Sequence, residues 1–339
     1  MSDLRPATGP NSNPTLSLVI PTLRRRELLE RLLSSLLAQQ LETGAFEVIV
    51  VDNTPAGDNP TLEVCLEDKF KMGLDLRYAH QPERGANEAR NCGTALARAD
   101  WVGFIDDDET LPPDFVSRAL QTCLTPAPDG FGGPYIPYFE TAKPVWFKDD
   151  YLLIWLGPNA RWLEKDEALN GGNMFFKRSW LVEMGGFPRR FGRSGDNLGY
   201  GDETDLMLRM TQKGARLWYD PQLFILHFTP ADRMSVRWFM RSKWLHGKAK
   251  AHIRFRDPAN RDDRSRARVA LSGIKVLLQK CFKIAFLYAA VPVRDRQKYP
   301  YPQNYIVEVI CPQVSGFSTA WHFLNLNLER EESRRQINV

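Results

Sequence analysis

The chain has 339 residues, of which 43% are hydrophobic and 25% charged, and its formal net charge is +4. This composition is typical of a globular protein and excludes a disordered or fibrous chain. A chain of this length can bury a large core, and about two domains are expected from it.

The charge is unevenly distributed along the chain. Residues 1–231 carry 24 Lys and Arg against 32 Asp and Glu, whereas residues 232–300 carry 18 against 5. Residues 301–339 carry 3 against 4. The sequence therefore combines an acidic front with a strongly basic block and a nearly neutral tail.

The N-terminus and the cysteines carry no sign of export. Residues 1–14 are rich in Pro, Ser and Asn and lack an apolar signal segment, which predicts a flexible lead. The 5 cysteines are widely spaced without a C-x-x-C pair, as in reduced cytoplasmic proteins. No run of 18 apolar residues occurs, so a transmembrane helix is not expected.

Strands of the buried type alternate with helices over the first hundred residues. Apolar runs predict strands at 16–22, 46–51 and 101–105, and a shorter strand is expected at 76–80. Helices are expected between them, at 24–40 and 85–99. This alternation predicts an α/β fold with a mostly parallel sheet.

Ligands of such sheets bind at the carboxyl ends of the strands. The polar residues at those ends are Pro21-Thr22, Asp52-Asn53 and the run Asp106-Asp107-Asp108. The first turn has no glycine, and no P-loop motif occurs, so a dehydrogenase or a P-loop NTPase is disfavoured. One aspartate after a strand would be an ordinary turn or helix cap. Three adjacent carboxylates repel one another, which favours a divalent metal site.

An ordered set of segments now indicates a family. LSLVIPTLRR, FEVIVVDNTPAGD, GANEARNCG, WVGFIDDDE, NGGNMFFKRS, GGFP and YGDETDLMLRM together resemble the family 2 glycosyltransferases of the GT-A fold, over about residues 15–245. The resemblance implies a Rossmann-like, nucleotide-binding mixed sheet flanked by helices. Residues 246–339 match no motif of the family and are expected to form a basic, helical extension.

The resemblance also implies roles for single residues. Asp52 matches the acid that contacts the base, usually uracil, and Asp106 the one that faces the ribose. Asp108, Asp106 and His227 match the ligands of a divalent cation, Mg²⁺ or Mn²⁺, although a histidine at a strand end can equally be structural. The positions implied to contact the nucleotide or donor sugar are Pro21, Thr22, Asp52, Arg90, Asn91, Asp106, Asp107, Gly172 and Asn173.

The second acidic motif, Asp202-Glu203, opens an amphipathic helix that is expected to run to Lys213. Acids in a first helical turn can act simply as caps. The family's usual order is E-D, so the inverted order here places Glu203 at the position of the catalytic base and leaves Asp202 as an alternative. The resemblance implies an inverting, metal-dependent transfer of a sugar from a nucleotide sugar, with a UDP-sugar as the expected donor. The acceptor would be a hydroxyl of a glycan or of a lipid-linked molecule, in the synthesis of surface polysaccharide or glycoconjugates.

Two segments leave alternatives open. The aromatic stretch from Tyr135 to Trp162 fits either an acceptor platform or core packing. Residues 265–291 predict a basic amphipathic helix, which fits either an anionic membrane interface or packing on the catalytic domain with lysines outward. No nucleic-acid-binding motif accompanies the basic block, so a nucleic-acid partner is not expected. The expected location is the cytoplasm, with a peripheral position at the inner face of the membrane as a variant.

A phosphatase is the alternative function. Residues 104–110 resemble the D-x-D-x-T motif of haloacid-dehalogenase-like hydrolases, in which Asp106 would be the nucleophile. That motif normally lies on the first strand of its domain, whereas here three predicted strands precede it. The transferase is therefore favoured.

Overall fold

A computed structural model describes residues 14–39, 45–55, 64–65, 67–164, 167–188, 201–256 and 266–337. The predicted N-terminal lead thus lies almost wholly outside the described residues. The chain divides into two compact units. The first holds the described residues of 1–138, 149–197 and 202–228, and the second holds 139–148, 201 and those from 229 onward. The predicted domain boundary near residue 245 stays a prediction.

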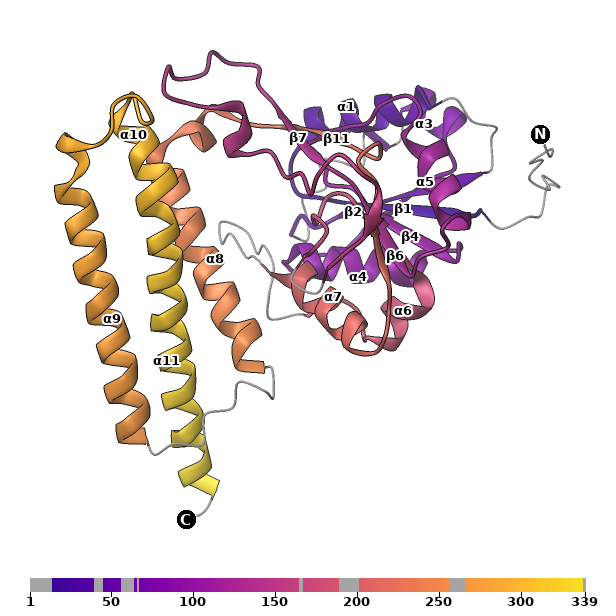
Figure 1. The fold of residues 1–339 in the computed structure, drawn as a ribbon. Coiled ribbons are helices and arrows are strands. Elements are labelled where there is room, and N and C mark those ends of the chain that lie inside the picture. The colour runs from indigo at the N-terminus through magenta and orange to yellow at the C-terminus, as the bar shows by residue number, and fades with distance from the viewer. Residues whose placement is uncertain are drawn as a thin grey trace. The chain divides into compact units, whose positions relative to one another are not determined.

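A mixed sheet forms the centre of the first unit (Figure 1). Among the described residues it has 8 strands in the order β3-β2-β1-β4-β9-β6-β10-β8. These are β1 (Leu16–Thr22), β2 (Phe46–Asp52), β3 (Leu76–His80), β4 (Trp101–Phe104), β6 (Gly130–Gly132), β8 (Arg161–Trp162), β9 (Met174–Lys177) and β10 (Leu217–Tyr219). The first four in sequence are mutually parallel, whereas β9 is antiparallel to β4 and β6. The predicted α/β class is confirmed.

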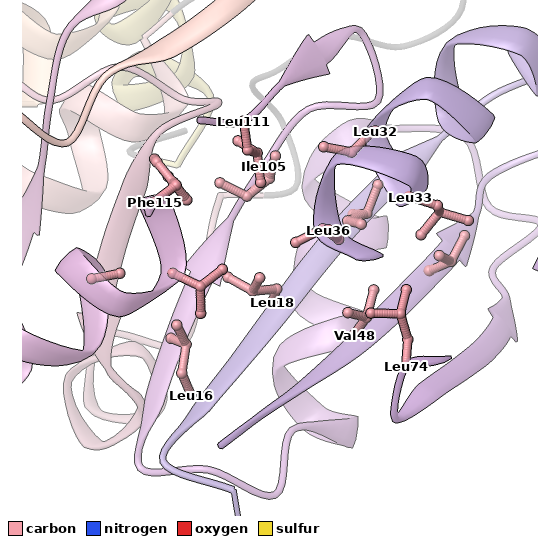
Figure 2. Close-up of a cluster of buried hydrophobic side chains, with 14 of the residues drawn as sticks. Leu16, Leu18, Leu32, Leu33, Leu36, Val48, Leu74, Ile105, Leu111 and Phe115 are labelled. Carbon is pink, nitrogen blue, oxygen red and sulfur yellow. The ribbon is translucent and has the colours of Figure 1, made fainter. Parts of the chain in front are cut away.

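Helices cover both faces of this sheet, because each strand buries side chains on both sides. Leu16 and Leu18 of β1 enter one core (Figure 2), as does Ile20. Val19 of the same strand enters the other core. The helices over the first core are α1 (Arg26–Leu37), α3 (Asp68–Gly73) and α5 (Phe115–Leu124). Those over the second core are α4 (Ala86–Leu96), α6 (Arg178–Glu183) and α7 (Asp202–Gln212). A short 3₁₀ turn, η1 (Asp149–Tyr151), also belongs to this unit.

A small second sheet was not predicted from the sequence. Its strands β5 (Glu109–Thr110), β11 (Ile225–Phe228) and β7 (Tyr135–Tyr138) lie in that order. The antiparallel register of β5 and β11 places His227 opposite Glu109. This pairing brings a histidine from the end of the first unit beside the acidic run that follows β4.

The second unit is helical. Its helices are α8 (Val236–Arg256), α9 (Arg266–Ala289), α10 (Pro302–Tyr305) and α11 (Cys311–Ile337), with a π-helical turn η5 (Ile306–Ile310) before α11 and 3₁₀ turns η2 (Ala231–Met234) and η4 (Val291–Val293). Helix α11 packs along both α8 and α9 (Figure 1). At Gly247 the absence of a side chain lets α8 approach Ser315 and Ser318 of α11 closely. Within the described part of the chain, no helix has the length and apolar character needed to cross a membrane.

Candidate active site

The strand ends that are predicted to bind a ligand lie at one edge of the sheet, because β2 and β4 each pair in parallel with β1. Thr22 and Asp52 are register partners at the ends of β1 and β2. The acidic run begins two residues after β4 ends at Phe104, beside β1. Pro21 and Thr22 therefore lie between Asp52 on one side and the acidic run on the other.

Asp107 is held by the turn that follows β1. The hydroxyl of Thr22 donates a hydrogen bond of 2.8 Å to its carboxylate, and Arg25 Nη1 lies 2.9 Å from its other oxygen. The loss of hydration on burial raises the pKa of Asp107 to about 6, and Asp108 adds to this, although Arg25 acts in the opposite direction. Asp107, which is predicted to contact the nucleotide, is thus paired with Arg25, a residue for which the sequence predicted no role.

Asp108 lies between Arg25 and His227. Arg25 Nη1 is 3.0 Å from one of its oxygens, and His227 Nε2 is 3.3 Å from the other. The ring of Tyr135 packs against the imidazole, with their centroids 4.2 Å apart. Two of the predicted metal ligands are therefore adjacent. No group of three His, Cys, Asp or Glu residues is already arranged to hold a metal ion anywhere in the described residues.

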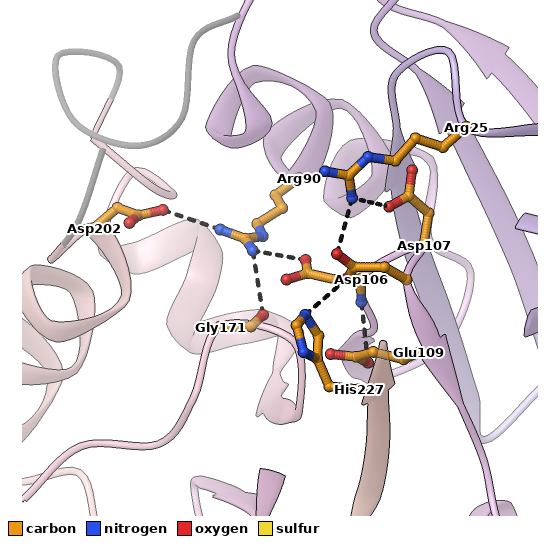
Figure 3. Close-up of polar contacts among 9 residues, drawn as sticks. Arg25, Arg90, Asp106, Asp107, Glu109, Gly171, Asp202 and His227 are labelled. Carbon is orange, nitrogen blue, oxygen red and sulfur yellow. Dashed lines mark hydrogen bonds and ion pairs between the residues drawn. The ribbon is translucent and has the colours of Figure 1, made fainter. Parts of the chain in front are cut away.

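Arg90 connects the two acidic motifs (Figure 3). From α4, its Nη2 lies 3.1 Å from Asp106 Oδ1, and its Nη1 lies 3.0 Å from Asp202 Oδ2. Nη2 also donates a hydrogen bond of 3.3 Å to the carbonyl of Gly171. Burial acts to lower the pKa of this guanidinium, but the carboxylates around it raise it overall. A buried, permanently charged arginine is thus the electrostatic centre of the site.

The first turn of α7 carries the two candidate bases. Asp202 is buried and accepts a hydrogen bond from Arg90, whereas Glu203 is half-buried. The loss of hydration, together with the charge and hydrogen bonding of Asp202, raises the pKa of Glu203 well above its usual range. We call Gly171-Gly172-Asn173 the glycine loop. A Cβ atom on Gly171 would lie 3.9 Å from the Glu203 carboxyl carbon, so this carboxyl borders the glycine loop.

The glycine loop lies directly against the acidic run. A Cβ atom on Gly172 would overlap Glu109 Oε1 and approach Asp106 Oδ2 to 3.1 Å, so any larger residue here would displace the Glu109 carboxylate. Glu109 is buried, and one of its oxygens accepts a hydrogen bond of 3.2 Å from the Asp106 amide. Within the described residues its other oxygen has no hydrogen-bond partner. Burial, with Asp106 and Asp108 nearby, raises the pKa of Glu109 well above its usual range. The sequence showed this residue only as the end of the acidic run.

Three further residues that are predicted to contact the nucleotide or the donor sugar are also bonded to the protein itself. Asp52 is fully buried and accepts hydrogen bonds from the Thr54 amide at 2.9 Å and the Tyr78 hydroxyl at 3.1 Å. The Asn91 side chain pairs with the backbone N–H and C=O of Phe187 at 2.8 and 3.0 Å. The Asn173 amide donates to the carbonyls of Pro134 and Leu223. Both asparagines therefore fix loops next to the site.

Comparison with known proteins places the chain among glycosyltransferases. The model of glycosyl transferase family 2 matches residues 17–185. The chain is 27% identical to the succinoglycan biosynthesis protein ExoM of Rhizobium meliloti (strain 1021), over 78% of this chain and 83% of that protein. It is also 27% identical to the glucosyl-dolichyl phosphate glucuronosyltransferase of Haloferax volcanii, over 74% of this chain and 80% of that one.

Solved structures share the fold. The mannosyltransferase PcManGT from Pyrobaculum calidifontis, in complex with GDP-Man and Mn²⁺, matches with a TM-score of 0.58 at 18% identity over 96% of this chain and 91% of its own. TarS residues 1–349 from S. aureus, in complex with UDP-GlcNAc, match with a TM-score of 0.52 at 15% identity over 95% of this chain and 92% of that one. The predicted GT-A fold is confirmed, and the chain belongs to glycosyl transferase family 2.

Proposed function

We propose that this glycosyltransferase moves a sugar from a nucleotide sugar, with a UDP-sugar as the expected donor, to a hydroxyl group of a glycan or lipid-linked acceptor, with inversion. The observation that carries the proposal is the position of Arg90 between Asp106 and Asp202. In-line displacement needs a base on one face of the anomeric carbon and charge neutralisation on the other. Because one guanidinium contacts both acidic motifs, the groups for these two functions line one site.

A divalent cation, Mg²⁺ or Mn²⁺, is part of this proposal. The residues that would hold it are Asp108, Asp106 and His227. They fit such an ion, because Asp108 Oδ1 and His227 Nε2 approach to 3.3 Å, and oxygen and imidazole nitrogen are suitable donors. Burial raises the pKa values of Asp107 and Glu109, and the neighbouring carboxylates of the acidic run add to this effect. Bound there, the cation would neutralise the charge that develops on the departing diphosphate.

Glu203 is the proposed base. It takes the proton of the acceptor hydroxyl while that oxygen bonds to the anomeric carbon, and the bond to the diphosphate oxygen breaks with its electron pair leaving on the nucleotide. Its raised pKa makes it a stronger base than an ordinary carboxylate. Asp202 is occupied by Arg90, which supports its role as the group that orients the guanidinium. At the nucleotide, Asp52 would accept a hydrogen bond from the nucleobase of the donor. The Tyr78 hydroxyl and the Thr54 amide hold the Asp52 carboxylate in place.

One exposed aromatic residue is the proposed acceptor contact. In the predicted platform, Trp146 packs against Phe147, and Trp162 packs against Trp218. Trp155, by contrast, is 53% exposed. It follows Ile154, which forms an isolated bridge to Tyr135, the residue that packs on His227. An exposed indole beside the site can stack on a sugar ring. The names of the relatives, in succinoglycan synthesis and in glucuronosyl transfer to glucosyl-dolichyl phosphate, support a glycan or lipid-linked acceptor.

The test separates donor binding from transfer. A panel of nucleotide sugars is first screened by thermal shift with and without Mn²⁺, and the donor found is used in a transfer assay. The Glu203→Gln variant is expected to lose transfer while it binds UDP and Mn²⁺ normally in calorimetry. Glu183→Gln, which alters an exposed glutamate paired with Lys213, is the matched control and should keep both. Near-normal turnover by Glu203→Gln would refute the assignment, and hydrolysis of a generic phosphate ester that depends on Asp106 would instead support the phosphatase.

A further inference from the structure

Helix α9 turns an apolar face outward. Leu271, Ile274, Leu278, Phe282 and Phe286 recur at helical spacing along it and are all exposed, with each of the two phenylalanines 73% exposed. We call these five residues the α9 stripe. Soluble domains rarely leave a continuous apolar row of this size uncovered, so the row indicates a contact surface.

The opposite side of α9 already has its partner within the second unit. Leu277 of α9 and Leu324 of α11 form a small buried cluster. Gly273 lets Leu324 lie close against the α9 backbone. Leu277 is the buried residue among the described side chains of α9, whereas the α9 stripe lies on the side of the helix away from it.

The charge beside the α9 stripe is entirely positive. Helix α9 contains five basic residues and no acidic one. Of these, Arg268, Lys275 and Lys283 have exposed side chains, and Lys275 falls within the same arc of the helix as Leu271 and Phe282. The surface of α9 therefore combines apolar insertion with attraction for anions. An anionic lipid bilayer matches both properties, because it offers an apolar interior and negatively charged headgroups, whereas an ordinary protein core offers only an apolar surface.

We propose that α9 lies in the interface of an anionic lipid bilayer, with the α9 stripe inserted among the acyl chains and its lysines at the headgroups. The helix spans 24 residues but does not meet the requirements for a membrane span, which favours an orientation parallel to the surface. The inference deepens the lipid-linked form of the proposed function, because it would place the enzyme at the surface where such an acceptor is embedded.

The full chain is tested by flotation with vesicles of phosphatidylcholine alone or mixed with phosphatidylglycerol. Wild-type protein should float with the anionic vesicles and lose this binding in high salt. The variant Phe282→Glu/Phe286→Glu should lower the partition coefficient by roughly tenfold or more. The matched control is Met72→Glu/Val182→Glu, which makes the same charge change at two exposed apolar residues of the first unit and should float normally. Circular dichroism checks that both variants remain folded.

A probe on the helix gives an independent measurement. Cys281 is the exposed cysteine, whereas the other four are buried or partly buried. An environment-sensitive fluorophore on Cys281 should shift to the blue with anionic vesicles, and Cys281→Ser should remove the signal. Failure to float, or equal flotation of the Phe282→Glu/Phe286→Glu variant, would overturn the proposal. A dimer in light scattering that this variant abolishes would instead assign the α9 stripe to a second copy of the chain. Transfer to a water-soluble acceptor should be unchanged in the Phe282→Glu/Phe286→Glu variant. Failure of membrane binding can therefore be distinguished from failure of the proposed glycosyl transfer.

Discussion

Replacing Arg90 with methionine should test whether one buried guanidinium holds the site together. Methionine keeps much of the side-chain length but leaves Asp106 and Asp202 without their shared cation. Removing one partner of a buried ion pair costs about 3–5 kcal/mol. The side chain of Asp202 is 6% exposed and that of Asp106 is 31% exposed, so only the first pair is fully shielded from water. We therefore expect a loss of about 3 kcal/mol in the free energy of unfolding.

The measurement is denaturant unfolding of the full chain, with the midpoint and the slope compared between variants. The control is Arg118→Met, which breaks an exposed pair with Asp114 at 2.6 Å and should cost less than about 1 kcal/mol. Adding Asp202→Asn to Arg90→Met should recover part of the loss, because the buried negative charge is then removed. If Arg90→Met destabilises the chain no more than Arg118→Met does, the reasoning about Arg90 is wrong.

Two further predictions concern the glycine loop and the base. The rate of transfer should fall as the pH drops through the raised pKa of Glu203. Asp202→Asn should move this acid limb of the kcat/KM profile to lower pH, because it removes the neighbouring negative charge. An acid limb that stays in place in Asp202→Asn would contradict the proposed interaction between the two carboxylates. Gly172→Ala should lower the thermal midpoint and weaken donor binding at a cost of about 1–3 kcal/mol, because its methyl group meets Glu109. Gly171→Ala, whose nearest neighbour would be 3.3 Å away, should be milder, and equal effects in the two variants would refute the steric argument.

The sequence predicted that polar strand ends meet at one edge of the sheet, for a physical reason. Apolar runs predict buried strands, and parallel neighbours end at one edge, so the sequence alone places Thr22, Asp52 and Asp106 near one another. The ordered motifs then indicated the family, and the family model confirms it. What these patterns report is local: the hydrophobic period of each element and the polar residues at its end.

The assignment of partners within the site depended on the tertiary structure. The contacts of Arg25, Glu109 and Tyr135 with the other site residues were not predicted, because they come from packing between segments far apart in the chain. The small sheet that brings His227 to Asp108 includes a strand of two residues, which is too short to produce a periodic signal. Likewise, Asn91 matched a nucleotide-binding segment, but its side chain pairs with the backbone of Phe187.

The uneven charge of the chain shows the same division between sequence and structure. Composition alone separated an acidic front from a strongly basic block, because counting charges needs no coordinates. Helical periodicity predicted a basic amphipathic helix, but it could not tell which face is buried. Leu277 packs against α11 while Phe282 and Phe286 remain exposed, and only the position of a neighbouring helix decides this. Burial is a property of the other elements around a residue, so the tertiary structure alone could show that α9 presents apolar and basic side chains together.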